Sequence, residues 1–331
     1  MQMTRTALIA IGGNALVLDG EPGSIPRQQE RAAEFAEQCV DLVSTGWTVV
    51  VSHGNGPQVG FILRRGELVA SHRSIEGLPE LPLWLAVADS QGGIGHIIAM
   101  AIDNELSRRG LPTRAAVLIT HAEVDPGDPE FAAPTKPIGS RMTADVAHRR
   151  ASEENWTVRE TSPGVFRRVV PSPRPNVILE VDHVLALIAS GAVVVAAGGG
   201  GIPVVRTENG WRSIDAVIDK DRASAVLAAT AHVEVLVLVT GVDEVSVGFG
   251  TPAQRPLRDI SADEARQHLE AGEFPAGSMG PKIDAALQFL HGGGREAVIT
   301  SLARLKEALA GEAGTHITRH DARVSQSGHQ T

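Results

Sequence analysis

Apolar runs that favour β-strands alternate with segments of helical periodicity along most of the chain, and several of these runs end in a glycine-rich turn. The runs AVVVAA at 192–197 and VEVLVLV at 233–239 lack the polar alternation of a half-exposed strand, which is typical of strands buried on both faces. Strands joined to helices by short glycine-rich turns predict a mostly parallel sheet with helices on both faces. We therefore expect an α/β fold, built as one large unit or two lobes over 331 residues.

The pattern places the individual elements approximately. We expect strands over 6–11, 47–52, 114–120, 192–197, 233–240 and 297–300. We expect helices over 28–43, 85–106, 221–229, 261–271 and 282–290. The segment 204–214 is predicted to form a hairpin that turns at Glu208-Asn209-Gly210.

Two regions break the alternation. Residues 122–176 are rich in Pro, Asp and Arg and are too long for a plain connection, so we interpret them as an inserted excursion or a small subdomain that could act as a lid. The last residues, 318–331, are polar and predict a disordered tail. We divide the folded chain into an N-terminal lobe at 1–200 and a C-terminal lobe at 201–317.

Glycine-rich turns follow four of the expected strands: GGN at 12–14, HGNG at 53–56, GGGG at 198–201 and TGVD at 240–243. In an open α/β sheet such strand ends share one edge, where ligands bind. Exposed backbone N–H groups and helix N-termini suit anions. One such turn alone is more often just a tight turn, but four on one edge favour a phosphate-rich ligand.

Several functional classes are disfavoured. The net charge of −9 argues against a nucleic-acid binder with a basic face. No run reaches the ~20 apolar residues that span a bilayer, and the N-terminal apolar run is too short for a signal peptide, so we expect a cytoplasmic protein. P-loop, dinucleotide, protein-kinase and zinc motifs are missing. The single cysteine, Cys39, lies on an apolar helical face and is predicted to be a buried core thiol.

Lysine is scarce, and this scarcity is informative. Of 30 basic residues only Lys136, Lys220, Lys282 and Lys306 are lysines. A lysine kept in such a chain can do what arginine cannot, such as placing a compact ammonium against a phosphoryl group. Lys220 stands between two aspartates, which can orient ammonium groups or hold Mg²⁺. Taken singly, each lysine could be an ordinary surface residue; Lys306, on an amphipathic helix, is expected to be one.

These motifs, in order, resemble the carbamate kinases, a branch of the amino acid kinase family, from about residue 7 to 317. The resemblance rests on long motifs, namely GGNAL at 12–16, HGNGPQVG at 53–60, SQGGIGH at 90–96, DPGDPEFAAPTKPIG at 125–139, RRVVPSPRP at 167–175, GGGGIPVV at 198–205, AVIDKDRA at 216–223, LVTGVDEV at 238–245 and GSMGPKIDAA at 277–286. Much of the wider family has a lysine just before the first GG, where this chain has Ala10 and Ile11. The carbamate branch lacks it too and carries PTKPIG.

The resemblance implies a three-layer αβα sandwich with a mostly parallel open sheet, a protruding subdomain and a homodimer. It further implies that the lobe at 1–200 holds carbamate, the phosphoryl acceptor, and that the lobe at 201–317 binds the nucleotide. It also implies a reversible reaction in which ATP and carbamate give ADP and carbamoyl phosphate, with Mg²⁺ accompanying the nucleotide. We assign no residue as a direct protein ligand of the metal. In many bacteria the reaction runs toward ATP during arginine, agmatine or purine breakdown.

The resemblance also implies roles for individual residues. The residues expected to hold carbamate and the transferring phosphoryl group are Gly12, Gly13, Asn14, Gly54 and Asn55. Three lysines are expected to neutralise that group during in-line transfer, oriented by Asp221; they are Lys136, Lys220 and Lys282. The residues expected to cradle the nucleotide phosphates are Gly199, Gly200 and Gly201, and those expected to border adenine are Val242, Ser246, Gly248 and Met279.

The chain departs from the family pattern around the expected adenine site. Ser246 and Gly248 stand where the family often has Tyr and Asn, Gly241 replaces an Asp, and His96 replaces a common Tyr. Two other functions remain open: a kinase of another small carboxylate, and a non-catalytic sensor of nucleotide or carbamoyl phosphate. The retained lysines argue against a sensor, which does not need groups that act in the transition state.

Overall fold

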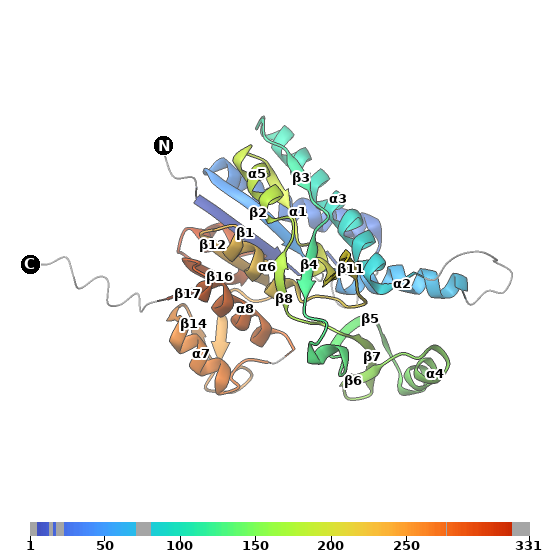
Figure 1. The fold of residues 1–331 in the computed structure, drawn as a ribbon. Helices are drawn as coiled ribbons and strands as arrows, with labels where there is room; N and C mark the ends of the chain where they lie inside the picture. The colour runs from blue at the N-terminus through green and yellow to red at the C-terminus, as the bar shows by residue number, and fades with distance from the viewer. Residues whose placement is uncertain (1–4, 13–15, 18–22, 71–80, 276, 320–331) are drawn as a thin grey trace, which may run out of the picture.

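The computed structural model describes residues 5–12, 16–17, 23–70, 81–275 and 277–319. An eight-stranded sheet lies at its centre, in the order β15-β17-β16-β12-β1-β2-β9-β3 (Figure 1). Its strands are β1 (Arg5–Ile11), β2 (Trp47–His53), β3 (Ala115–Val117), β9 (Val193–Val195), β12 (Val235–Thr240), β15 (Asp259–Ser261), β16 (Glu296–Ser301) and β17 (Thr315–Thr318). All neighbouring pairs are parallel except β16 with β17, which confirms the predicted mostly parallel sheet.

Strand β1 shows why the apolar runs do not alternate. Ala7 and Ile9 point into one hydrophobic cluster, whereas Leu8 and Ala10 point into another, so both faces of the strand are buried. A strand with cores on both sides needs apolar residues at every position. The uninterrupted apolar runs therefore encode a sheet that lies between two layers of helices.

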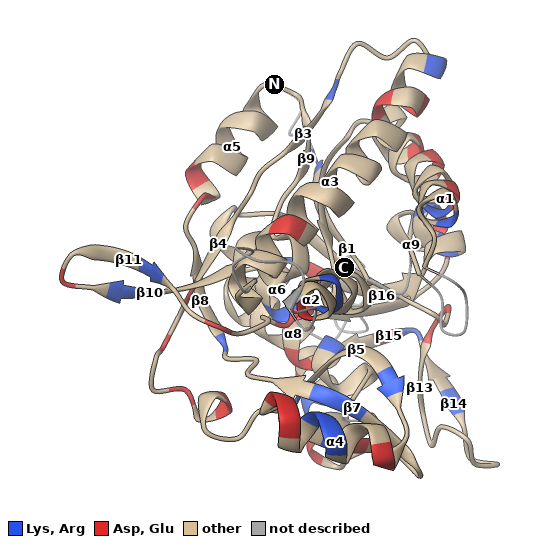
Figure 2. Cartoon of the chain, turned by 90° about the vertical axis from the view of Figure 1, so that its right-hand side faces the viewer, with Lys and Arg blue, Asp and Glu red and all other residues tan. Residues whose placement is uncertain are grey.

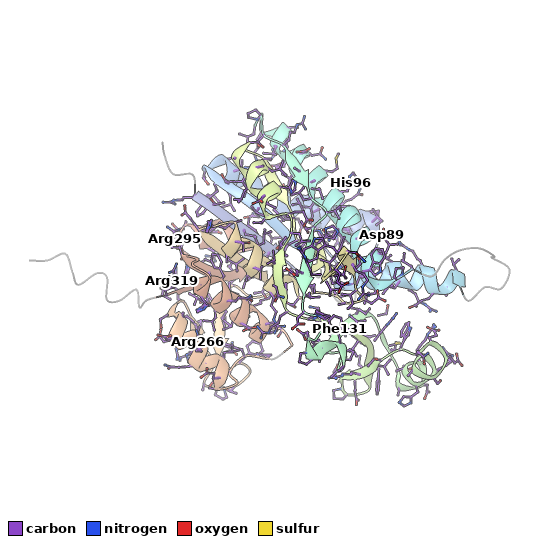
Figure 3. The ribbon with its side chains drawn as sticks, viewed as in Figure 1. Asp89, His96, Phe131, Arg266, Arg295 and Arg319 are labelled. Atoms are coloured by element: carbon purple, nitrogen blue, oxygen red, sulfur yellow. The ribbon has the colours of Figure 1, made fainter. Side chains whose placement is uncertain are left out.

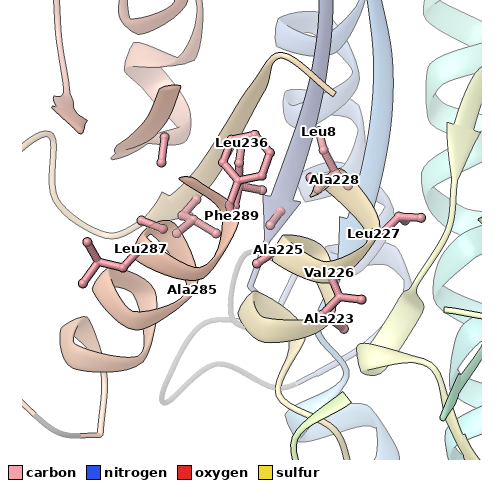
Figure 4. Close-up of a cluster of buried hydrophobic side chains, with 14 of the residues drawn as sticks. Leu8, Ala223, Ala225, Val226, Leu227, Ala228, Leu236, Ala285, Leu287 and Phe289 are labelled. Carbon is pink, nitrogen blue, oxygen red and sulfur yellow. The ribbon is translucent and has the colours of Figure 1, made fainter. Parts of the chain in front are cut away.

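The two helical layers follow from these clusters. One face of the sheet is covered by α1 (Ile25–Ser44), α3 (Leu83–Arg108) and α9 (Leu305–Leu309). The other is covered by α5 (Val181–Ala189), α6 (Lys220–Thr230) and α8 (Met279–His291). Figure 4 shows α6 and α8 side by side, with Phe289 of α8 against Leu236 of β12. Cys39 is fully buried in α1, as predicted, and burial raises the pKa of its thiol to about 12.

Residues 122–176, which were predicted to break the alternation of strands and helices, contain strands and a helix of their own. Strands β5 (Lys136–Met142), β7 (Val165–Val170) and β6 (Val158–Ser162) form a separate antiparallel sheet beside α4 (Ala144–Glu154), at the lower right of Figure 1. The flanking strands β4 (His121–Val124) and β8 (Pro175–Ile178) instead join a second sheet with β10 (Ile202–Thr207) and β11 (Gly210–Ser213). The part that protrudes as its own sheet is thus narrower than 122–176. The division into lobes at residue 200 stays a prediction.

Other differences from the expected elements are local. The hairpin is confirmed as β10 and β11, whereas β3 is only three residues long. Helix α2 (Gly56–Ala70) and α5 were not predicted. Among the described residues, the remaining elements are β13 (Val245–Val247), β14 (Arg255–Leu257), the predicted helix α7 (Ala262–Glu270) and short 3-10 turns at Pro129–Phe131, Gly198–Gly200 and Leu302–Arg304.

The prediction of a disordered tail is wrong at its first residue. Thr318 belongs to β17, and the next residue, Arg319, which is labelled in Figure 3, follows directly. Its Nε donates a hydrogen bond to the Gly294 carbonyl at 3.0 Å. Strand pairing and this hydrogen bond hold the chain to the sheet up to that point. The rest of the predicted tail lies outside the described residues.

By length and composition alone, α3 could cross a membrane. It packs instead against α1 and β3 and buries Ile94, Ile98 and Ile102 in the core. Its polar residues include Asp89 and the exposed His96, both labelled in Figure 3. We therefore interpret α3 as a core helix.

Candidate active site

The carboxyl ends of β12, β1, β2 and β9 meet at one edge of the sheet because these four strands are parallel neighbours. The glycine-rich turns therefore lie together, as predicted. Of the described turns at 53–56, 198–201 and 240–243, only the first leads directly into an α-helix, where α2 begins at Gly56. The turn after β9 leads to β10 and the turn after β12 leads to β13.

Helix α6 delivers Lys220 and Asp221 to this edge. It begins at Lys220 because Asp219 caps its N-terminus, where Oδ1 accepts from the backbone N–H of Asp221 at 3.0 Å and of Arg222 at 3.3 Å. Carboxylates are favoured caps since they satisfy free N–H groups at the positive end of the helix. The first turn of α6 is thereby fixed under the end of β1, and Lys220 Nζ lies 3.5 Å from the Ala10 carbonyl oxygen.

Three of the four lysines converge on two carboxylates. Lys220 Nζ lies 2.6 Å from Asp221 Oδ1, and Lys282 Nζ, from the first turn of α8, lies 2.8 Å from Asp221 Oδ2. Lys136, the first residue of β5, reaches Asp219 Oδ2 at 2.6 Å. The ammonium groups predicted to act together are thus brought together from three separate elements. Lys306 lies elsewhere, on α9, with a half-exposed side chain near Asp41.

The cluster carries one more positive than negative charge when all five groups are ionised. Burial lowers the pKa of Lys220 to about 8, against the opposing pull of Asp221. Burial would also lower the pKa of Lys282, yet the Asp221 carboxylate raises it. Burial would raise the pKa of Asp221, but Lys220 and Lys282 hold it below its usual value. A buried positive excess of this kind favours an incoming anion.

Asp219 is the site residue that the expected catalytic set lacked. Its pKa is lowered because the charge of Lys136 outweighs the effect of burial. The sequence Asp219-Lys220-Asp221 indicated that both aspartates could hold lysines. Which lysine each aspartate holds could not be predicted from it. That choice is made by tertiary structure.

On the expected acceptor side, Asn55 is the best-defined residue. Its Nδ2 donates to Ser90 Oγ at 2.9 Å, and the side chain is almost fully buried. It faces Gly199, where an added Cβ would lie 2.3 Å from Asn55 Nδ2. The structure therefore brings the expected acceptor turn and the expected nucleotide turn into contact.

The other expected acceptor residues are less directly placed. Gly12 follows β1 at the same sheet edge. The N–H of Gly54 donates to the Ile11 carbonyl at 2.9 Å, so that N–H is engaged within the protein rather than turned to a ligand. Gly13 and Asn14 lie outside the described residues.

The expected nucleotide residues fall into two groups. Gly199, Gly200 and Gly201 have positive φ and form a tight buried turn that only glycine adopts readily. Val242 follows β12, and Met279 begins α8 one turn before Lys282. Ser246 lies in β13, and Gly248 just after it donates its N–H to Glu273 Oε2 at 2.9 Å, so Gly248 is tied to the loop before α8 and not to the lysine cluster.

His53 is a second residue that the sequence alone did not single out. It ends β2, is fully buried, and has its pKa lowered to about 4 by that burial, so it is neutral at physiological pH. A Cβ on Gly198 would lie 2.5 Å from its Nε2. The ring therefore fills the space between the turns after β2 and β9.

Comparison with known proteins agrees with this geometry. The model of the amino acid kinase family matches residues 5–301. The carbamate kinase-like protein YahI of Escherichia coli is 44% identical over 96% of this chain and 100% of its own length, and the carbamate kinase of Pyrococcus horikoshii is 39% identical with the same two coverages. The solved structure of carbamate kinase from Giardia lamblia bound to citric acid has a TM-score of 0.89 and 36% identity, covering 96% of this chain and 99% of that one. The chain belongs to the amino acid kinase family, within its group of carbamate kinases and carbamate kinase-like proteins.

Proposed function

We propose that this protein is a carbamate kinase, which transfers a phosphoryl group reversibly between ATP and carbamate to give ADP and carbamoyl phosphate. The observation that carries the proposal is the convergence of Lys136, Lys220 and Lys282 on Asp219 and Asp221 at the sheet edge. The names of the relatives that match over the full length support the choice of carbamate.

The proposed mechanism needs no covalent intermediate on the protein. In phosphoryl transfer the protein mainly aligns the two oxygens and stabilises the charge that spreads over the transferring group. Asp221 uses both of its oxygens to hold Lys220 and Lys282 as a pair, and Asp219 holds Lys136. The three ammonium groups then face the same anion from different elements, and a compact ammonium suits this role better than a planar guanidinium.

We propose that Mg²⁺ enters with the nucleotide and is held by phosphate oxygens. Mg²⁺ sites in proteins usually combine one or two carboxylates with substrate phosphates. Here all four oxygens of Asp219 and Asp221 already accept hydrogen bonds, and within the described ranges no group of three or more His, Cys, Asp or Glu is arranged to hold a metal. These contacts support a role of the two carboxylates in orienting the ammonium groups, and we propose no direct protein ligand for Mg²⁺.

We further propose a homodimer that forms through the β3 edge of the main sheet. An edge strand exposes backbone groups that can pair with a second chain. Val117 in β3 and Ile119 just after it are large apolar residues that remain partly exposed, and Met100 on the neighbouring α3 is exposed as well. Figure 1 shows this edge between α3 and α5, away from both termini.

The proposed direction is toward ATP in the cytoplasm, as the resemblance to catabolic carbamate kinases suggests. The test is a coupled assay of ATP formation from ADP with carbamoyl phosphate, and with acetyl phosphate as the comparator. We expect kcat/KM to be at least about 10²-fold higher with carbamoyl phosphate than with acetyl phosphate, because a site built for carbamate recognises the amide group that acetyl phosphate lacks. A preference for acetyl phosphate would indicate a kinase of another carboxylate, and no turnover of either would favour a sensor.

A further inference from the structure

Two motif glycines that are distant in sequence meet backbone to backbone. Gly60 closes the motif HGNGPQVG and lies in α2, whereas Gly139 closes PTKPIG and lies in β5. Figure 2 shows β5 and β7 beneath α2, and α2 packs directly on β5. A Cβ built on Gly60 would lie 2.1 Å from Gly139 Cα and 2.6 Å from Gly139 N. The contact therefore has no room for even a methyl group.

The backbone of Gly139 is also fixed by its own strand. Its φ is +67°, in the left-handed region that favours glycine, and it lies where the register of β5 with β7 becomes irregular. Its carbonyl accepts from Arg167 Nη2 of β7 at 2.8 Å. Gly139, which contacts Gly60 through its Cα and N, is thus also bound to β7 through its carbonyl group.

The same strand carries Lys136 three residues earlier, about 10 Å away at the usual rise of a strand. Between them Ile138 is buried against Val59 and Leu63 of α2. Lys136 then projects to Asp219 Oδ2 at 2.6 Å. The position of this ammonium group therefore depends on how closely β5 lies against α2.

We propose that the Gly60–Gly139 contact is a positioning element that sets the place of the Lys136 ammonium group relative to the phosphoryl group. The inference rests on the proposed function, because it counts Lys136 among the cations that act on that group. Helix α2 starts directly after the Gly54–Asn55 turn, so the contact links the expected acceptor turn to the subdomain that supplies Lys136. Neither glycine touches a substrate in this account; both act through Lys136.

The first test is the substitution Gly60→Ala. The new Cβ would lie 2.1 Å from Gly139 Cα, and the two atoms must separate to more than 3.0 Å. Gly139 therefore has to shift, and β5 transmits the shift to Lys136. Because a misplacement of about 1 Å can cost about 10²-fold in rate, we expect kcat for ATP formation to fall about 10²-fold with KM for ADP within about threefold. The matched control is Gly93→Ala in α3, where a Cβ meets nothing within 4 Å, and its kcat should not change.

A double-mutant cycle of Gly60→Ala with Lys136→Met distinguishes an effect through Lys136 from a general disruption of the active site. If Gly60 acts through Lys136, adding Gly60→Ala to Lys136→Met should lower kcat by less than about threefold further. The same hundredfold loss in both backgrounds would overturn the inference, as would an unchanged kcat in Gly60→Ala alone. Near-normal kcat in Lys136→Met alone would instead overturn the proposed mechanism, so the two failures are distinguishable.

A second variant covers the case in which Gly60→Ala does not fold, as judged by circular dichroism and thermal melting. Gly139→Ala has space, since its nearest neighbour would be Gly60 Cα at 3.7 Å, but it strains the positive φ. We expect it to lower kcat about three- to tenfold in the normal background and not measurably in Lys136→Met. An equal loss in both backgrounds, or no loss in either, would contradict the inference.

Discussion

Asp219 divides its two carboxylate oxygens between two tasks. Oδ1 caps α6, whereas Oδ2 holds Lys136. The two tasks can be separated, because asparagine is as good a helix cap as aspartate but carries no charge for the lysine.

We therefore expect Asp219→Asn to lower kcat by roughly 10- to 10²-fold while leaving the melting temperature close to normal. Asp219→Ala should lose the same activity and also about 1 kcal/mol of stability with the cap. Steady-state kinetics and thermal melts of both variants give the comparison. An Asn variant with full activity, or one as unstable as the Ala variant, would show that Asp219 is a cap and nothing more.

The titration of Lys220 gives a second prediction at this scale. Burial lowers its pKa to about 8, while Asp221 and Asp219 pull the pKa up and Lys282 pushes it down. The protonated form is the one that neutralises phosphoryl oxygens, so kcat/KM should decline as the pH rises through about 8. Bound anions favour the protonated form, so kcat should decline only at higher pH.

Lys220→Arg is the matched variant for the pH profile. Arginine stays charged throughout this range, so its kcat/KM should be lower at neutral pH but should lack the alkaline decline. A wild-type kcat/KM that stays flat to pH 10 would mean that Lys220 keeps its proton and that the argument from burial is wrong.

The residues of the lysine cluster were largely predictable. Scarcity of lysine and the Asp-flanked and Pro-flanked contexts single out Lys136, Lys220 and Lys282 from the sequence alone. Asp219 was noted as one of two aspartates able to orient ammonium groups but was not placed in the catalytic set, and His53 was not singled out, because their roles depend on contacts between segments that are far apart in sequence. The engagement of the Gly54 N–H by Ile11 is likewise a product of strand register.

At the scale of elements, the period of apolar residues located six of the eight strands of the main sheet and most of the long helices. Helix α2 was not predicted because its sequence, which begins GPQVGFILRRG, contains three glycines, which disfavour helices. In the folded protein, packing against β5 stabilises the helix. The edge strand β3 has three residues and is shorter than the predicted strand. Helix α5 was not predicted because it is short and mostly apolar, so it shows no clear helical periodicity.

The segment after β12 carries a prediction about adenine. Ser246 in β13 stands where the family often has an aromatic ring, and stacking on a ring contributes about 1–3 kcal/mol per base. Ser246→Tyr should therefore tighten ADP binding by roughly 5- to 150-fold with little change in kcat. Isothermal titration with ADP measures this, with the exposed Ser162→Tyr of β6 as the control.

Unchanged or weaker ADP binding in Ser246→Tyr would contradict the idea of a missing ring. Phe249, which is 63% exposed just after β13, is then the side chain to examine. Loss of ADP affinity in Phe249→Ala would show that this ring has taken over the contact.

At the scale of the whole molecule, the mostly parallel sheet and its two helical layers follow from the sequence pattern, because strands buried on both faces leave few other arrangements. The way in which the protruding sheet of β5, β6 and β7 is attached to the rest of the protein could not be predicted from the sequence pattern. The attachment depends on the Gly60–Gly139 contact and on the apolar residues that α2 shares with β5, and neither leaves a periodic signal.

The proposed dimer is a prediction at the same scale. Light scattering after size exclusion should give a mass twice the 34.8 kDa of one chain. Ile119→Lys should shift the protein toward the monomer, since it places a charge beside the exposed edge of β3. Ile25→Lys, at an exposed apolar position on α1, is the control and should leave the mass unchanged. A wild-type mass of a single chain would refute the dimer.

The central claim is that three lysines held by two aspartates form the phosphoryl-transfer centre of a carbamate kinase. The most direct test is kcat for ATP formation from ADP and carbamoyl phosphate in Lys136→Met, Lys220→Met and Lys282→Met, with the exposed Lys306→Met as the matched control. We predict losses on the order of 10²–10⁴-fold in each of the first three, the range expected when one electrostatic stabiliser is removed, and no loss in Lys306→Met. Near-normal kcat in all three cluster variants would contradict the account.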